Sequence, residues 1–230
     1  MGEQPLVNRE RERKDKELEA IRQKLETTTD RLGAEIEEGI KEVVVGLNVM
    51  GLTTVQSCEG HPDSSHGYPY PWVMIEAPGE PEESHVGEKE LCERFAREHG
   101  VDAEQLLRAA VSEEVWFEFQ EQIEALPELT PEFITWREAN RKLYERAIGL
   151  LEEFYFDRTV SLDVQVRAIP INEDTMVFQL RSNEKLNYED EGPESALAQQ
   201  ERQEALKKLK PRRDEMEAFA DFLKNKFLNS

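Results

Sequence analysis

Cysteine is scarce in this chain of 230 residues, with Cys58 and Cys92 as its two examples. Two thiols cannot form the dense disulfide framework of a small secreted protein, so we expect a reducing, cytoplasmic compartment. Long hydrophobic runs are also missing. No stretch approaches the roughly 20 apolar residues of a membrane helix, and the charged N-terminal residues do not resemble a signal peptide. The sequence therefore predicts no membrane association.

Basic residues are in deficit, because 29 Lys and Arg stand against 50 Asp and Glu and give a formal charge of −21. Such a field repels phosphate backbones and argues against nucleic acid as a partner, leaving small molecules or other proteins. The one basic cluster, Lys207–Arg213, is interpreted as a solvated helix junction. The nucleotide-binding P-loop and G-x-G-x-x-G motifs are missing, as are the hydrolase motifs H-E-x-x-H and G-x-S-x-G.

The apolar residues, 38% of the chain, are enough to form a core. Their spacing predicts an α+β fold, with a small sheet of about four strands covered by helices and with helical N- and C-terminal extensions. Strands are expected over 52–56, 72–75, 162–168 and 176–181. We expect a charged N-terminal helix over 1–30, an α+β core domain over 31–187, and an acidic linker with C-terminal docking helices over 188–230.

The N-terminal helix carries an apolar seam with alternating spacings of three and four residues. Its members are Leu18, Ile21, Leu25, Thr28 and Leu32. The seam covers about two heptads, fewer than the three or four that are typical of a stable coiled coil. Two interpretations stay open: the helix forms a coiled-coil homodimer, or it packs along one side of its own domain.

The segment Ser57-Cys58-Glu59-Gly60-His61 is the strongest candidate for a functional site. It directly follows a short β-branched stretch, and Gly60 would allow a sharp turn through positive φ. Cys58 and His61, three residues apart around that turn, are then expected to point to the same side. Ser57, Glu59 and Gly60 are candidate ligand-binding residues beside them.

A thiol and an imidazole on a tight turn suit two chemistries. Both groups bind zinc well, and His66 would be a third metal ligand, with His85 or Cys92 as a fourth. Alternatively, Cys58 is a nucleophile with His61 as its base, although Glu59 and Asp63 nearby would oppose thiolate formation. A third interpretation is purely structural, with Cys58 buried and His61 bonded to backbone.

Aromatic residues follow in the next loop, His66–Trp72. Each of its prolines forces the preceding tyrosine into an extended conformation, so Tyr68, Tyr70 and Trp72 are expected on one side. Such a row either stacks a flat ligand or simply covers the edge of the sheet. Arg167 and Arg181, on the polar faces of the two later strands, are candidates for positive charge near the turn.

The segment from Gly51 to His61, followed by Trp72–Ile75, resembles small uncharacterised bacterial and phage proteins with a Gly-x-x-Thr and a Ser-Cys-(Glu/Gln)-Gly-His motif. More distantly, Ser57, Cys58 and Gly60 are similar to the Ser-Ser-Cys-Ser-Gly-Arg motif of the wybutosine-synthesis methyltransferase family, in which arginine stands where this chain has His61. The first resemblance implies no known activity. The second would imply S-adenosylmethionine and tRNA as ligands.

Together these patterns predict a Cys/His site at Ser57–His61 in a metal-binding protein or small-ligand enzyme; the cofactor is not identified by the sequence, and zinc is the candidate. The alternative is a non-catalytic helical interaction protein in which the same segment is a structural turn.

Overall fold

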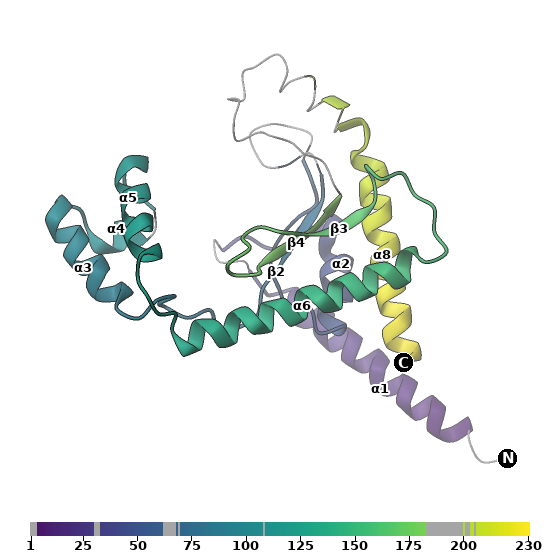
Figure 1. Ribbon diagram of the computed structural model, residues 1–230. Helices are drawn as coiled ribbons and strands as arrows, with labels where there is room; N and C mark the ends of the chain where they lie inside the picture. Colours follow the sequence, from purple (N-terminus) through teal and green to yellow (C-terminus); the bar gives the residue numbers. More distant parts are fainter. Residues whose placement is uncertain are drawn as a thin grey trace. The chain divides into compact units, whose positions relative to one another are not determined.

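The computed structural model describes residues 4–29, 33–61, 68, 70–107, 109–182, 200, 203–204 and 206–230. Within these ranges the chain folds into helices and one four-stranded antiparallel sheet, which confirms the predicted α+β class and its helical termini (Figure 1). The chain divides into two compact units. The first combines Met1–Glu76 with Asn140–Ser230, and the second is Ala77–Ala139.

The sheet belongs to the first unit and has the strand order β1-β2-β4-β3. The strands are β1 (Thr54–Cys58), β2 (Trp72–Ile75), β3 (Val166–Pro170) and β4 (Phe178–Ser182). All neighbouring strands are antiparallel, with Cys58 opposite Trp72, Trp72 opposite Arg181, and Arg181 opposite Arg167. Residues directly opposite one another share a face of the sheet. These four therefore form one row across it.

Helices cover the other sheet face and form the main core with it. The helices of this unit are α1 (Gln4–Leu25), α2 (Glu38–Val49), the C-terminal part of α6 (Pro131–Tyr155) and α8 (Leu209–Asn229). Val73, Ile75, Phe178 and Leu180 from the sheet are fully buried against apolar residues of α2, α6 and α8. Helices α2 and α8 approach closely at Gly46, where an added Cβ would lie 3.2 Å from the Ala220 carbonyl oxygen.

Helix α1 packs on its own unit. Leu25 is buried in the main core, and Leu18 and Ile21 pack against it. A charged cluster ties the helix further, because Arg22 donates to Glu42 of α2 at 2.9 Å and Lys224 of α8 donates to the same carboxylate at 2.9 Å. The predicted apolar seam thus faces the chain's own core as far as it is described, since Leu32 lies outside the described residues. The predicted homodimer stays a prediction.

The second unit is helical, with α3 (Glu88–His99), α4 (Ala103–Leu107), α5 (Glu113–Glu124) and the first turns of α6. Its small core centres on Phe95 and Phe119, whose ring centroids lie 5.3 Å apart. Cys92 is buried in this core. At the start of α6, Thr130 accepts a hydrogen bond from the Phe133 amide at 3.1 Å, which is the cap expected of a threonine before proline.

The two units cut across the domain boundaries that the sequence predicted. The sequence predicted a core domain over 31–187 with an N-terminal helix and C-terminal docking helices beside it, whereas α1 and α8 pack in the same unit as the sheet and Ala77–Ala139 forms a unit of its own. The interpretation of Lys207–Arg213 as a solvated junction is wrong for part of the cluster, because Arg212 is fully buried and Arg213 bonds to the turn after β1. In the part of the chain that the structure describes, no helix combines the length and the apolar character needed to cross a membrane.

Candidate functional site

The turn after β1 presents the candidate residues. Gly60 has φ +83°, a left-handed conformation that side chains rarely adopt, and an added Cβ there would lie 2.7 Å from both the Tyr70 carbonyl carbon and Leu209. The His61 amide donates to the Tyr68 carbonyl at 2.8 Å, which closes the loop between β1 and β2. Glycine at this position therefore fixes the bend that was predicted from the sequence.

Two glutamates connect this turn to the start of α2 through hydrogen bonds. The Glu59 amide donates to Glu37 Oε2 at 2.7 Å, and in return the Gly39 amide donates to Glu59 Oε2 at 2.8 Å. Glu37 is the residue before the first turn of α2, so Glu59 supplies the cap for a backbone N–H that the helix itself leaves unpaired.

Arg213 of α8 holds the turn from a second side. Its Nε donates to the Glu59 carbonyl at 2.7 Å, and its Nη2 donates to Glu59 Oε1 at 3.1 Å and to the Gly60 carbonyl. Contacts from two helices, α2 and α8, therefore hold the turn in one geometry.

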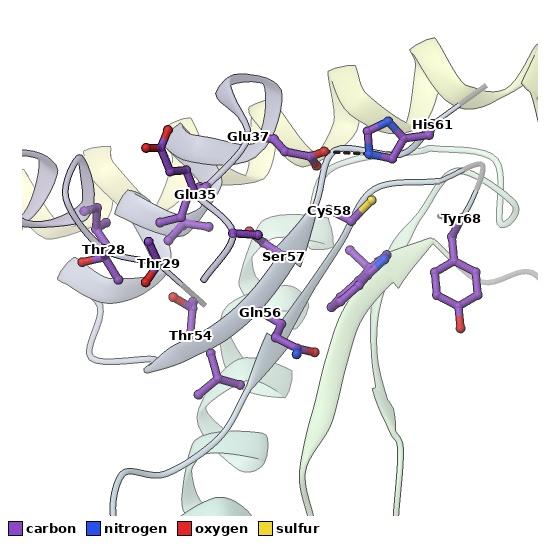
Figure 2. A pocket seen from close by; sticks show the side chains of 16 residues that line it. Thr28, Thr29, Glu35, Glu37, Thr54, Gln56, Ser57, Cys58, His61 and Tyr68 are labelled. Carbon is purple, nitrogen blue, oxygen red and sulfur yellow. Dashed lines mark ion pairs between the residues drawn. The ribbon is translucent and has the colours of Figure 1, made fainter. Parts of the chain in front are cut away.

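Three potential metal ligands converge at this turn. Glu37, Cys58 and His61 each offer one ligand atom, and these atoms all lie within 4.8 Å of one another. His61 Nε2 lies 2.6 Å from Glu37 Oε1. Figure 2 shows the Cys58 sulfur on the same side of the ring as Nε2, while the other ring nitrogen turns away. Among the described residues, this is the one cluster of three such groups.

The environment of Cys58 keeps its thiol protonated. Burial raises the pKa of Cys58 most, and the negative charge of Glu37 raises it further, against the opposing effect of the Gly60 amide. That amide donates to the sulfur at 3.3 Å. The thiol of Cys58 therefore needs an added positive charge before it becomes a thiolate at neutral pH.

The cluster lies at the wall of a cavity of about 570 Å³ in the first unit. One wall is the whole of β1, and the other is the segment between α1 and α2 (Figure 2). Among the described residues, the lining includes Glu35 and Glu37 but no lysine or arginine. A cavity of this size is in the range of small-ligand sites, and its charge favours neutral or cationic ligands.

The structure brings together about half of the residues that were predicted for the site. Those that line the cavity are Ser57, Cys58, His61, Tyr68 and Trp72. Glu59 and Gly60 lie next to it, where they build the turn instead of lining the cavity. His66 lies outside the described residues.

The remaining predicted ligand-binding residues have structural contacts. Tyr70 is buried, stacks on Tyr68 at 5.3 Å between centroids, and accepts a hydrogen bond from Arg181 Nη1 at 2.9 Å. Arg181 and Arg167 share the sheet row of Cys58 and Trp72, but neither lines the cavity. The expected aromatic row is therefore split, with Tyr68 and Trp72 at the cavity and Tyr70 packed behind them.

Sequence reasoning missed two residues of the site. Glu37 and Arg213 are separated from Cys58 by a helix or by most of the chain, and each is one charged residue among many. No motif distinguishes them, since their role comes only from where α2 begins and where α8 packs.

Comparison of the chain with protein families, with curated proteins and with solved structures gives no match in any of the three. The resemblances of the Ser57–His61 segment therefore stay predictions.

Proposed function

We propose that this protein binds a divalent transition metal ion, with zinc as the best candidate, through Glu37, Cys58 and His61. The observation that carries the proposal is the convergence of a carboxylate, a thiol and an imidazole within 4.8 Å at the wall of a cavity. Carboxylate oxygen, cysteine sulfur and histidine nitrogen are all common zinc ligands.

The spacing of the three groups supports this assignment. With metal–ligand distances of about 2.0–2.3 Å, tetrahedral coordination places ligand atoms about 3.5 Å apart. The pair of Glu37 and His61 is 2.6 Å apart, and all three ligand atoms lie within 4.8 Å of one another, which brackets that value. Small side-chain rotations would therefore be enough to close the three groups around an ion.

The charges also favour a metal ion over a free nucleophile. A thiolate–imidazole pair needs the sulfur on one ring nitrogen and the orienting carboxylate on the other. Here Glu37 contacts Nε2, the nitrogen that also faces the sulfur (Figure 2). Burial and Glu37 raise the pKa of Cys58, which opposes nucleophilic activation, whereas a bound cation would displace the thiol proton.

Three protein ligands leave a fourth position open, which distinguishes catalytic from structural zinc sites. The cavity lies beside that position and has room for a ligand or substrate without net negative charge. An ion held there would supply Lewis-acid chemistry, polarising a carbonyl group or a bound water. A reducing, cytoplasmic compartment would keep Cys58 available as a ligand.

Cobalt titration tests the proposal, because thiolate coordination gives Co²⁺ an intense near-ultraviolet absorption band. We expect wild-type protein to bind one Co²⁺ with this band and to lose it when Zn²⁺ is added. Cys58→Ser should abolish the band, and Glu37→Gln and His61→Ala should weaken binding at least tenfold, in line with the loss of one direct ligand.

The chain offers a matched control for each ligand. Cys92 is a buried free cysteine of the second unit, Glu35 lines the same cavity outside the cluster, and His99 stacks on Phe95 within the second unit. Cys92→Ser, Glu35→Gln and His99→Ala should leave the titration unchanged. Wild-type protein without stoichiometric metal, or with a thiolate band that survives Cys58→Ser, would refute the proposal.

A further inference from the structure

All five residues of β1, Thr54–Cys58, line the cavity. Successive side chains of a strand point to opposite faces of the sheet, so a cavity over one face would be lined by every second residue. Lining by consecutive residues instead places the cavity along the edge of the strand. The strand order β1-β2-β4-β3 agrees, because within the described part of the chain β1 pairs with a strand on one side only.

The edge of a strand is a row of main-chain donors and acceptors, and every second residue directs its N–H and C=O away from the sheet. In β1 the register shifts between Thr54 and Gln56 and is regular from Gln56 to Cys58. The regular part is therefore the section of the edge that is best suited to pair with another strand, and it ends at the proposed metal ligand Cys58.

We propose that the cavity is a binding groove for an extended segment of another protein, which joins the sheet as a fifth strand beside β1. Extended peptides commonly add to free sheet edges in this way, with main-chain hydrogen bonds giving affinity and side-chain pockets giving specificity. The opposite wall is formed by Thr28, Thr29 and 34–37.

The charge of the groove defines the segment further. Glu35 and Glu37 line it, and the lining residues that the structure describes include no lysine or arginine. A neutral or basic segment is therefore favoured over an acidic one. A segment that follows β1 to its end would place one residue next to Glu37, Cys58 and His61. The proposal shares the cavity with the proposed metal site but does not depend on it, because main-chain pairing needs no ion.

Peptide binding to metal-free protein tests the groove. A displayed library of randomised nonapeptides is selected against wild-type protein in the presence of a chelator, and the best peptide is measured by fluorescence anisotropy. Each of its amides is then N-methylated in turn. We expect alternation, with methylation at every second amide weakening binding about tenfold, since each loses a main-chain hydrogen bond, while the amides between them tolerate it within about twofold.

Two lysine substitutions locate the binding edge. Gln56→Lys adds a bulky cation to the cavity wall of β1, and Ile169→Lys adds the same group to β3, the opposite edge strand of the sheet. Gln56→Lys should lower the affinity for the peptide at least tenfold and Ile169→Lys less than about twofold, because lysine side chains block the pairing of strand edges. If Gln56→Lys lowers the melting temperature more than Ile169→Lys does, the N-methyl series on wild-type protein decides alone.

If no binder is selected, or if the affinity of the binder shows no alternation on N-methylation, the proposal of a peptide-binding groove is refuted. The metal proposal is not affected by either result. A concentration-dependent dimer that Gln56→Lys dissociates would assign the edge to a second copy and equally overturn the groove proposal.

Discussion

Replacing Gly60 by alanine is the sharpest test of how the turn after β1 is built. The residue has φ +83°, and an alanine Cβ would lie 2.7 Å from the main chain at Tyr70 and from Leu209. A left-handed conformation costs a residue with a Cβ about 1 kcal/mol or somewhat more. The steric conflict adds about 1–3 kcal/mol, because the backbone at Tyr70 cannot swing aside as a flexible side chain would.

Gly33→Ala separates the two contributions. Gly33 belongs to the same unit and has φ +81°, but an added Cβ there meets nothing within 4 Å. It should therefore show the cost of the conformation alone. We expect a loss of about 1 kcal/mol for Gly33→Ala and about 2–4 kcal/mol for Gly60→Ala. For a protein of this size, each kcal/mol lowers the melting temperature by about 2–4 °C.

Differential scanning calorimetry of both variants, followed by the cobalt titration, gives the comparison. Gly60→Ala should also weaken cobalt binding, because Cys58 and His61 lie on either side of the displaced residue, whereas Gly33→Ala should bind as wild type does. Equal melting temperatures for the two variants would refute the close contact at Gly60. Unchanged cobalt binding in Gly60→Ala would refute the idea that the turn positions the ligands.

Three further predictions concern other parts of the chain. The hydrogen bond from Arg22, with that from Lys224, lowers the pKa of Glu42 to about 2, so the stability it contributes is present above pH 4.5 and is lost as the pH falls toward 2. Because the Glu42 side chain is 44% exposed, we expect this contribution to the free energy of unfolding to be about 1 kcal/mol. Urea unfolding should therefore show a smaller loss of stability between pH 7 and pH 3 for Glu42→Gln than for wild type. Glu38→Gln, which changes an exposed side chain, is the control and should lose as much stability as wild type. Thr130→Ala should destabilise the second unit by about 1 kcal/mol through loss of its cap on α6, whereas Thr135→Ala should have little effect; equal melting curves for the two would contradict the cap. Iodoacetamide should modify Cys58 more slowly than a free peptide thiol at pH 7. Glu37→Gln should increase the rate of this modification, whereas Glu35→Gln should not. A rate that rises in Glu35→Gln but not in Glu37→Gln would show that Glu37 does not raise the pKa of Cys58.

Local patterns in the sequence determined the secondary structure well. The strand over 72–75 matches β2, and alternation of apolar residues predicted β4 within two residues, because one face of each strand is buried in the core. The prediction over 162–168 began too early. Only its end and the residues after it form β3, since Ser161–Gln165 instead form turns.

The turn after β1 could also be predicted from the sequence. Gly60 after a short β-branched strand indicated a bend, and that bend brings Cys58 and His61 together as expected. Conformation of this kind depends on the residue and its immediate neighbours, so it is encoded locally.

Only the tertiary structure decided what surrounds that turn. Glu37 joins Cys58 and His61 because α2 begins beside the end of β1, and Arg213 contacts the turn because α8 packs against α2. Both depend on contacts between segments far apart in the chain, and a single charged residue carries no pattern that reveals such a partner. The sequence specified the bend and the approach of Cys58 and His61, while packing of the helices supplied the neighbouring carboxylate and the cavity along β1.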